Sequence, residues 1–368
     1  PVTLLTHIKN EQGYQIAAQS GPGQVSLIKV RLRKTMMGTI RRTQSQESIT
    51  VPVEGKITSM IFDEAYNSLL IGTSFGQIFR ADLENTQNSA QLIGATSNPG
   101  IAVEHLGFTL GGYTLIVTES DGRVSSFQLA KSETKIFSLK KIYNFSSHKT
   151  PAKFFSFSLR NKGFLTGSNE MIRLHYGTTG ETQIQLPAEE KTAYKTAIIA
   201  PKFDGILTAD TQGILYLWKM ENPYPQVSLE GLFGEIWYEG YEEPTYVWQS
   251  TGGTDEFESK FSLVPLMFGT LKGTLYAMCF AVPLALFASF YVSQFMQPDL
   301  KRIIKPTIET MAALPSVVLG FFAALVIAPQ VETFLPGIMI MPIIVTIMIV
   351  TTLLAYEKFP ALQFMAKG

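Results

Sequence analysis

The residue types that most often carry out chemistry are sparse in this sequence and lie far apart. The four histidines are His7, His105, His148 and His175, and none of them has a partner at a metal-binding spacing. The single cysteine, Cys279, lies inside an apolar run, so neither a disulfide framework nor a cysteine-based metal site is expected. We therefore expect no metal, no cofactor and no catalytic residue, and we expect each histidine to occupy the surface or a turn.

A basic stretch near the beginning of the chain allows two interpretations. Residues 29–34 read Lys-Val-Arg-Leu-Arg-Lys, and Arg41 and Arg42 follow. Alternation places these bases on one face of a strand. We interpret the stretch as a solvated sheet edge that resists the addition of another strand. The alternative is a docking patch for an anionic partner.

Charge is distributed unevenly along the 368 residues. The formal net charge is zero and 16% of the residues are charged, which is low for a soluble protein. Polar residues fill the region up to about Lys260, and long apolar runs follow it. This pattern predicts a soluble domain followed by a membrane domain, and the balanced charge gives no reason to expect a nucleic-acid partner.

Three uncharged stretches after Lys260 are long enough to cross a bilayer. They cover residues 274–295, 310–331 and 333–356, and a bilayer core needs roughly 20 apolar residues. Buried helices of a soluble protein rarely run this long without a charge. We therefore predict a transmembrane domain over 263–368, with helices over about 264–295, 308–331 and 333–356.

Basic residues predict the orientation of these helices. Lys301, Arg302 and Lys305 lie in the expected loop between the first two helices, whereas Glu332 is the only charge between the second and third. Basic loops stay in the cytoplasm. We therefore expect a multi-pass protein of the inner (cytoplasmic) membrane whose N-terminal domain is extracytoplasmic, which requires an upstream signal or membrane helix. We also expect the chain to be a fragment, shortened at both ends.

The segment 223–262 is expected to link the two domains. Within it, residues 232–241 place apolar and acidic side chains on opposite faces of a helix. The apolar set comprises Leu232, Phe233, Ile236 and Trp237, and the acidic set comprises Glu235 and Glu239. We interpret the segment as an interfacial helix at the outer bilayer surface. The alternative is a helix that packs under the soluble domain.

The region 1–222 contains an internal repeat. A turn followed by an alternating strand begins at residues 23, 76, 122, 170 and 213, and Asp63, Asp121 and Asp210 lie in turns where aspartate bonds to the local backbone. The starts are 53, 46, 48 and 43 residues apart, close to the blade length of a WD40-like β-propeller. We predict an all-β propeller-like domain with five visible blades and one or two more before residue 1. The alternative is a β-sandwich.

The first membrane segments resemble a known family. Residues 268–274 (Phe-Gly-Thr-Leu-Lys-Gly-Thr) and 281–285 carry the first part of the likeness. The densest part is Leu-Lys-Arg at 300–302 and the run from Pro306 to Gly320, Pro-Thr-Ile-Glu-Thr-Met-Ala-Ala-Leu-Pro-Ser-Val-Val-Leu-Gly. This run resembles the permease subunit (PstC-type) of the phosphate-specific ABC importer family. The likeness covers roughly residues 248–329.

The resemblance implies a transmembrane permease subunit that moves inorganic phosphate across the cytoplasmic membrane. It implies four partners: a second permease subunit (PstA-type), a cytoplasmic ATPase subunit, an extracytoplasmic phosphate-binding protein and the lipid bilayer. The chain itself is not expected to be an enzyme, because ATP hydrolysis belongs to the partner. The family's cytoplasmic coupling loop and its later charged translocation residues do not occur in this sequence.

Residues of the motif have plain structural interpretations as well. Small residues at helical spacing let helices approach closely, and Pro283 and Pro315 can kink spanning helices. Glu309 is expected to pair with Arg302 or Lys305 at the membrane edge, because a carboxylate repels phosphate. The family-motif and helix-packing candidates are Gly269, Thr270, Gly273, Glu309, Ala312, Ala313, Pro315, Ser316 and Gly320.

Three alternative functions remain open at this point. The helices could anchor a propeller that acts as a scaffold or sensor, which the permease-like run disfavours. The propeller could be an extracytoplasmic enzyme, which the absence of clustered His, Asp or Glu disfavours. The permease could also carry a related oxyanion such as phosphonate, since the substrate rests on family resemblance alone.

Overall fold

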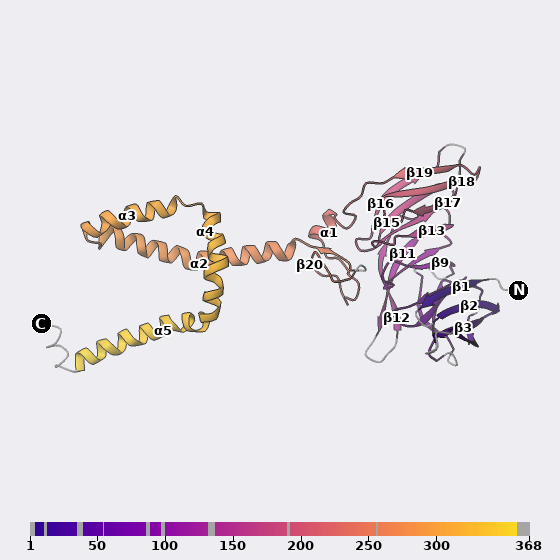
Figure 1. Ribbon diagram of the computed structural model, residues 1–368, viewed down its shortest axis with the longest axis horizontal. Helices are drawn as coiled ribbons and strands as arrows, with labels where there is room; N and C mark the ends of the chain where they lie inside the picture. Colours follow the sequence, from indigo (N-terminus) through magenta and orange to yellow (C-terminus); the bar gives the residue numbers. More distant parts are fainter. Residues whose placement is uncertain are drawn as a thin grey trace. The chain divides into compact units, whose positions relative to one another are not determined.

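The computed structural model describes residues 4–10, 13–34, 40–53, 55–85, 89–96, 100–131, 137–189, 192–254 and 257–358. The chain divides into two compact units, Pro1–Gly273 and Thr274–Gly368. The first unit is mainly β-sheet and propeller-like, with the short helix α1 and the beginning of α2 at its end (Figure 1).

Consecutive antiparallel strands build the first unit. Sheets one to four each contain four strands in sequence order, sheet five contains three, and a two-stranded sheet follows. The strands of sheets one to three are β1 (Leu5–Asn10), β2 (Gly13–Gly21), β3 (Gln24–Lys34), β4 (Ile40–Thr50), β5 (Ile57–Asp63), β6 (Ser68–Thr73), β7 (Gln77–Asp82), β8 (Gln91–Ala95), β9 (Val103–Phe108), β10 (Thr114–Glu119), β11 (Val124–Lys131) and β12 (Phe137–Asn144). The others are β13 (Phe154–Phe157), β14 (Gly163–Gly167), β15 (Met171–Tyr176), β16 (Glu181–Pro187), β17 (Tyr194–Ile199), β18 (Gly205–Asp210), β19 (Leu215–Lys219), β20 (Trp248–Gln249) and β21 (Lys260–Phe261).

Side-chain alternation along the second strands stacks the sheets on one another. On β6, Leu69 and Ile71 belong to the core shared with sheet one, whereas Leu70 belongs to the core shared with sheet three. On β14, Phe164 joins the core with sheet three and Leu165 the core with sheet five. Because successive side chains point to opposite faces, an apolar strand buried on both faces connects neighbouring cores. This stacking gives the propeller-like arrangement.

The repeat expected from the sequence is confirmed. Each of the five turn-and-strand segments forms the third strand of a sheet, namely β3, β7, β11, β15 and β19. The turn glycines before β7 and β11, Gly76 and Gly122, have φ of 77° and 88°, a region that favours glycine. Asp210 accepts the N–H groups of Gln212 and Ile214 at 2.8 Å each, as its turn position predicted. Five successive sheets also show that the β-sandwich alternative is wrong.

Residues 29–34 of the basic stretch lie in a central strand, whereas Arg41 and Arg42 lie in β4, an outer strand of the same sheet. Strand β3, which carries Lys29 and Arg31, pairs with β2 on one side and with β4 on the other. The sheet-edge interpretation is therefore wrong for this strand. It failed because alternation alone does not distinguish a central strand from an outer one.

Sheet five differs from the other four because no fourth strand pairs with β19 among the described residues. Leu215 and Leu217 of β19 are 65% and 78% exposed. The corresponding third strands of sheets two and four, β7 and β15, are mostly buried.

The amphipathic helix expected over 232–241 is not formed. The short helix α1 (Leu229–Phe233) stops where Gly234 adopts an extended conformation, and Ile236 then bridges to Thr245. Ile236 and Tyr238 are buried in the protein. The bilayer-surface interpretation is therefore wrong for these residues, which pack under the propeller-like sheets as an extended segment.

The remaining helices are α2 (Val264–Gln294), α3 (Pro298–Ala312), α4 (Ser316–Phe322), the π-helical η1 (Ala323–Ile327) and α5 (Ala328–Lys358). Two stretches of described helix, Val264–Gln294 and Ser316–Gly337, are long and apolar enough to cross a membrane, and Ile340–Thr352 is a shorter apolar helix. Helix α2 continues through Pro283, whereas Pro315 separates α3 from α4.

Two segments expected as loops are helical. Residues 298–306, with their three bases, lie in α3, which begins with Pro298 in its first turn and Asp299 beside it, both favourable helix-start residues. The expected loop around Glu332 lies in α5, and no loop separates η1 from α5. The wider π-helical turn ends two residues before Pro329, whose missing N–H and bulky ring disfavour a regular α-helix over the preceding turn.

Candidate functional site

The first family-motif residues lie on α2. Gly269 and Gly273 are one helical turn apart, and a side chain added at either would meet no atom within 4 Å. The hydroxyl of Thr270 donates to the carbonyl of Met267 at 2.9 Å, which keeps a polar group satisfied within its own helix. The two glycines would therefore allow another helix to approach closely.

The second group of motif residues surrounds the break between α3 and α4. Glu309 and Ala312 lie in the last turn of α3, Ala313 follows it, and its N–H donates to the carbonyl of Glu309 at 3.2 Å. Pro315 precedes α4 and Ser316 begins it. Proline is well suited to this position, because the first N–H groups of a helix need no partner within it.

Gly320 lies one turn further along α4 and, like the glycines of α2, has open space around its Cα. The structure thus brings Glu309, Pro315 and Gly320 to one helical corner. It leaves Gly269 and Gly273 on a separate helix.

The three bases lie on one helix rather than in a loop. The ammonium group of Lys301 donates to the carbonyl of Ser293 at 3.5 Å. Arg302 lies 3.9 Å from the carboxylate of Asp299, and both side chains are exposed. Among the described residues no ion pair joins Glu309 to Arg302 or Lys305, so that pairing stays a prediction. Three bases beside a spanning helix can attract anions or lipid headgroups.

Sequence reasoning missed a buried ionic network in the first unit. The ammonium group of Lys162 lies 2.5 Å from Glu239, with side chains only 4% and 12% exposed. Glu239 also accepts the hydroxyl of Thr114 at 2.7 Å. A second carboxylate, Glu258, accepts the hydroxyl of Thr178 and the N–H of Glu239. These partners lie 19 to 125 residues apart, so no local pattern could have indicated them.

Burial perturbs one member of this network. Desolvation raises the pKa of the Glu258 carboxyl above its usual value, and the charge of Glu239 raises it further. Hydrogen bonding to Thr178 and the charge of Lys162 oppose the shift. The charge of Lys162 therefore acts on both carboxylates.

Two histidines expected at the surface are buried instead. His148 is 3% and His175 is 0% exposed, and Thr166 joins them, with its hydroxyl 2.8 Å from the Nε2 atom of each ring. Desolvation lowers the pKa of His148 to about 4 and that of His175 to about 3. The surface expectation is confirmed for His7 and His105 only. No group of three or more His, Cys, Asp or Glu in the described ranges could hold a metal ion.

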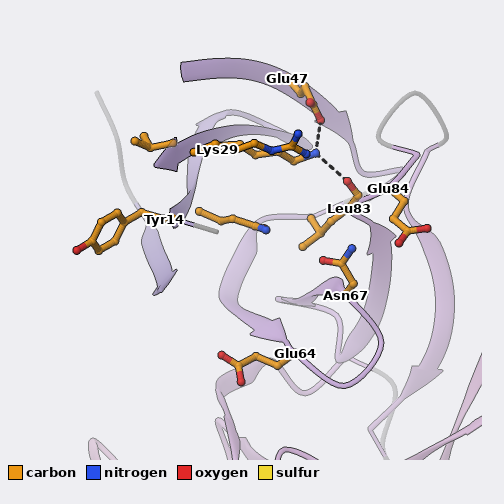
Figure 2. A pocket seen from close by; sticks show the side chains of 11 residues that line it. Tyr14, Lys29, Glu47, Glu64, Asn67, Leu83 and Glu84 are labelled. Carbon is orange, nitrogen blue, oxygen red and sulfur yellow. Dashed lines mark hydrogen bonds and ion pairs between the residues drawn. The ribbon is translucent and has the colours of Figure 1, made fainter. Parts of the chain in front are cut away.

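A polar pocket with a volume of about 630 Å³ lies between sheets one and two. Figure 2 shows Lys29 reaching from β3 to Glu47 of β4 and to the carbonyl of Leu83, at 2.9 and 2.7 Å. Glu64 and Glu84 line the side that sheet two provides. The carboxylates offset the basic stretch here, so this pocket does not favour the anionic-partner alternative.

Comparison with curated proteins finds local similarity to membrane permeases. The chain is 27% identical over 77 residues to a probable ABC transporter permease protein, YqgH, of Bacillus subtilis, covering 21% of this chain and 25% of that protein. It is 26% identical over 72 residues to the phosphate transport system permease protein PstC of Mycobacterium leprae, covering 20% and 23%. The PstC protein of Xylella fastidiosa is 27% identical over 78 residues, covering 21% and 24%. The chain thus spans about a quarter of the length of the curated relatives it matches.

Among solved structures, the chain is similar to β-propellers. A β-propeller domain of Cps50 (Swd1) from Myceliophteria thermophila gives a TM-score of 0.43 at 15% identity, covering 58% of this chain and 68% of that one. The WD40 β-propeller domain of Doa1 gives 0.40 at 18% identity, covering 62% and 66%. These scores are low, and the propeller-like description rests on the stacked sheets themselves. No protein-family model matches the chain. The local similarity to permeases covers about a fifth of the chain.

Proposed function

We propose that this chain is the permease subunit of an ABC importer that moves inorganic phosphate into the cell. The observation that carries the proposal is the local similarity to three permeases, two of which are named for phosphate transport. The two apolar helices long enough to cross a membrane support it. So does the family-like run from Glu309 to Gly320 at the corner between α3 and α4.

The same proposal includes the partners and the orientation. A second permease subunit (PstA-type), a cytoplasmic ATPase subunit and an extracytoplasmic phosphate-binding protein complete the importer, and the chain itself is not an enzyme. The bases Lys301, Arg302 and Lys305 favour a cytoplasmic position for the beginning of α3. The propeller-like unit is then extracytoplasmic and the protein crosses the inner membrane several times.

A second candidate function is a membrane-anchored propeller scaffold or sensor. The observation that favours it is the size of the propeller-like unit, which takes up most of the chain and ends directly at the first membrane helix. In this case the helices hold the propeller in place and translocate nothing. A permease for a related oxyanion such as phosphonate is the third possibility.

Uptake of radiolabelled phosphate distinguishes the three candidates. The full protein and its neighbouring transport subunits are expressed in a bacterium that lacks its own high-affinity phosphate uptake. We expect energy-dependent uptake that requires this chain and that unlabelled phosphate suppresses more strongly than phosphonate or sulfate does. Stronger suppression by phosphonate would reassign the substrate. Correct membrane insertion with neither uptake nor co-purification of an ATPase subunit would refute the permease and favour the scaffold.

A further inference from the structure

The chain between the fifth sheet and the first membrane helix is held firmly rather than loosely tethered. We name residues 234–254 and 257–262 the junction segment. Its apolar residues Ile236 and Tyr238 are buried, and the N–H of Trp237 donates to the phenolic oxygen of Tyr143, on β12, at 3.1 Å. A segment that buries side chains and satisfies its backbone groups on a sheet has little freedom to move independently.

Ionic contacts attach the junction segment to two sheets at once. Glu239 of the junction accepts the hydroxyl of Thr114, on β10 of sheet three, at 2.7 Å. It also pairs with Lys162, which precedes β14 of sheet four, at 2.5 Å. The same ammonium group donates to the carbonyl of Leu110, in the turn before β10, at 2.5 Å. Movement of the junction would therefore leave buried charges without partners, which is strongly unfavourable.

The second carboxylate closes the junction segment on itself. Glu258 accepts the hydroxyl of Thr178, in the turn after β15, and the N–H of Glu239 at 3.2 Å. Because Glu239 and Glu258 are 19 residues apart, this contact ties the beginning of the junction to its end. Sheets three and four thus hold both ends of the junction segment.

The end of the junction segment leads straight into α2. Lys260 is buried, with its ammonium group 4.8 Å from the ring centre of Phe257 and 5.5 Å from that of Tyr238. The N–H of Ser262 donates to the carbonyl of Val247 at 3.1 Å. Next, the N–H of Leu263 donates to the carbonyl of Leu232 at 2.8 Å, and α2 begins at the following residue. These contacts hold the last residues of the junction segment against the sheets up to the beginning of α2.

We propose that the junction segment is a rigid coupler, which makes the propeller-like unit and the first turns of α2 move as one body. A force or rotation that an extracytoplasmic partner applies to the propeller then reaches the first membrane helix directly. The Lys162–Glu239 pair is the central contact of this coupler, because it joins the junction to sheet four while Thr114 joins it to sheet three. The inference does not depend on which solute the membrane part moves.

Pulsed electron paramagnetic resonance measures this rigidity in the full chain. Cys279 is first replaced by serine, and spin labels are placed at Gln212→Cys in the turn before β19 and at Met267→Cys in α2, both exposed positions. A reference pair within the propeller-like unit, Lys149→Cys and Gln212→Cys, gives the width that label motion alone produces. We expect the propeller-to-α2 distance distribution to be as narrow as the reference. A native distribution several times wider than the reference would overturn the proposal.

Variants assign the rigidity to the ionic contacts. Lys162→Met should at least double the width of the propeller-to-α2 distribution and leave the reference pair narrow. The matched control is Lys219→Met, which removes a lysine from the exposed Lys219–Glu221 pair and should change neither width. If Lys162→Met is not inserted, Thr178→Val removes only one hydroxyl contact and should give a smaller broadening. Distributions as narrow as native in every variant obtained would show that the ionic contacts do not hold the junction.

Discussion

Acidification should destabilise the propeller-like unit through His148 and His175. Burial holds the folded-state pKa values near 4 and 3, whereas an exposed histidine titrates near 6.5. Below pH 6.5 the unfolded chain therefore binds protons that the folded chain does not. Stability from these two groups is fully present above pH 6.5 and is lost as the pH falls towards 4.

The size of the effect follows from the two pKa shifts. At pH 5 each unfolded histidine has gained a proton that its folded form still lacks. With about 1.4 kcal/mol per pKa unit, each histidine removes about 2 kcal/mol of stability, and the pair about 4 kcal/mol. A domain of this size loses about 2–4 °C in Tm for each kcal/mol, so the pair should lower Tm by about 8–16 °C between pH 8 and pH 5.

Thermal unfolding of the full chain in detergent, followed by tryptophan fluorescence, tests this prediction. All three tryptophans lie between residues 218 and 248 and therefore report on the first unit. The double variant His148→Gln/His175→Gln should show a much smaller fall in Tm over this pH range, whatever its Tm at pH 8. The control, His7→Gln, changes an exposed histidine and should keep the native pH dependence.

Carboxyl groups with raised pKa values act in the opposite direction. Asp63, Glu119 and Glu258 bind protons more readily in the folded chain, so acid favours their folded state. Because these groups are the same in both proteins, the difference between native and double-variant profiles isolates the histidines. Parallel profiles from pH 8 to pH 5 would show that the two rings are not held neutral, and the reasoning from burial would be refuted.

Three further predictions concern single contacts and orientation. Lys162→Met leaves Glu239 buried without its cation and should lower the unfolding free energy by about 3–5 kcal/mol. Lys219→Met should change it by no more than about 0.5 kcal/mol. Equal Tm values for the two variants would contradict this. In intact cells, with Cys279→Ser as background, Gln212→Cys should react with a membrane-impermeant thiol reagent and Asp299→Cys should not, and the reverse pattern would refute the orientation. Glu309→Gln should lower the yield of the assembled complex or its phosphate uptake, because Glu309 is expected to pair with Arg302 or Lys305; values equal to the parent would mean that Glu309 is only solvated.

The repeating part of the fold could be predicted because local signals repeat. A turn followed by an alternating strand marked the third strand of each of the first five sheets, and the turn geometry of Gly76, Gly122 and Asp210 agrees with it. The predictions that failed concerned residues whose surroundings are determined by neighbouring strands and sheets. Strand β3 looked like an edge because its bases alternate, yet β4 covers it. His148 and His175 looked like surface residues, yet sheets three and four close over them.

The junction segment is a second case in which tertiary contacts, rather than the local sequence pattern, determine the structure. The spacing of Leu232, Phe233 and Ile236 predicted an apolar helical face, but α1 ends at Phe233. Burial of Ile236 and Tyr238 and the pairing of Glu239 stabilise an extended path instead. Tertiary contacts commonly override helical periodicity in a segment of this length, because isolated short helices are marginal in water. In contrast, the beginning of α3 was marked locally by Pro298 and Asp299, and greater weight on these residues would have predicted the helix.

The rigid junction also determines how the role of the propeller in transport must be tested. A deletion that resumes near Trp248 would keep Glu258 and Lys260 but remove Thr178 and Tyr238, which they contact. Glu258 would lose both the hydroxyl of Thr178 and the N–H of Glu239, so failure of this chain could reflect an unpartnered carboxylate. A deletion of residues 1–262 removes both charges and leaves α2 intact. We expect this second chain, assembled with its ATPase subunit, to keep measurable phosphate uptake with altered affinity or regulation, because the permease-like similarity covers only about a fifth of the chain. No uptake at any phosphate or binding-protein concentration, in a correctly inserted and assembled complex, would mean that the propeller takes part in delivering the substrate.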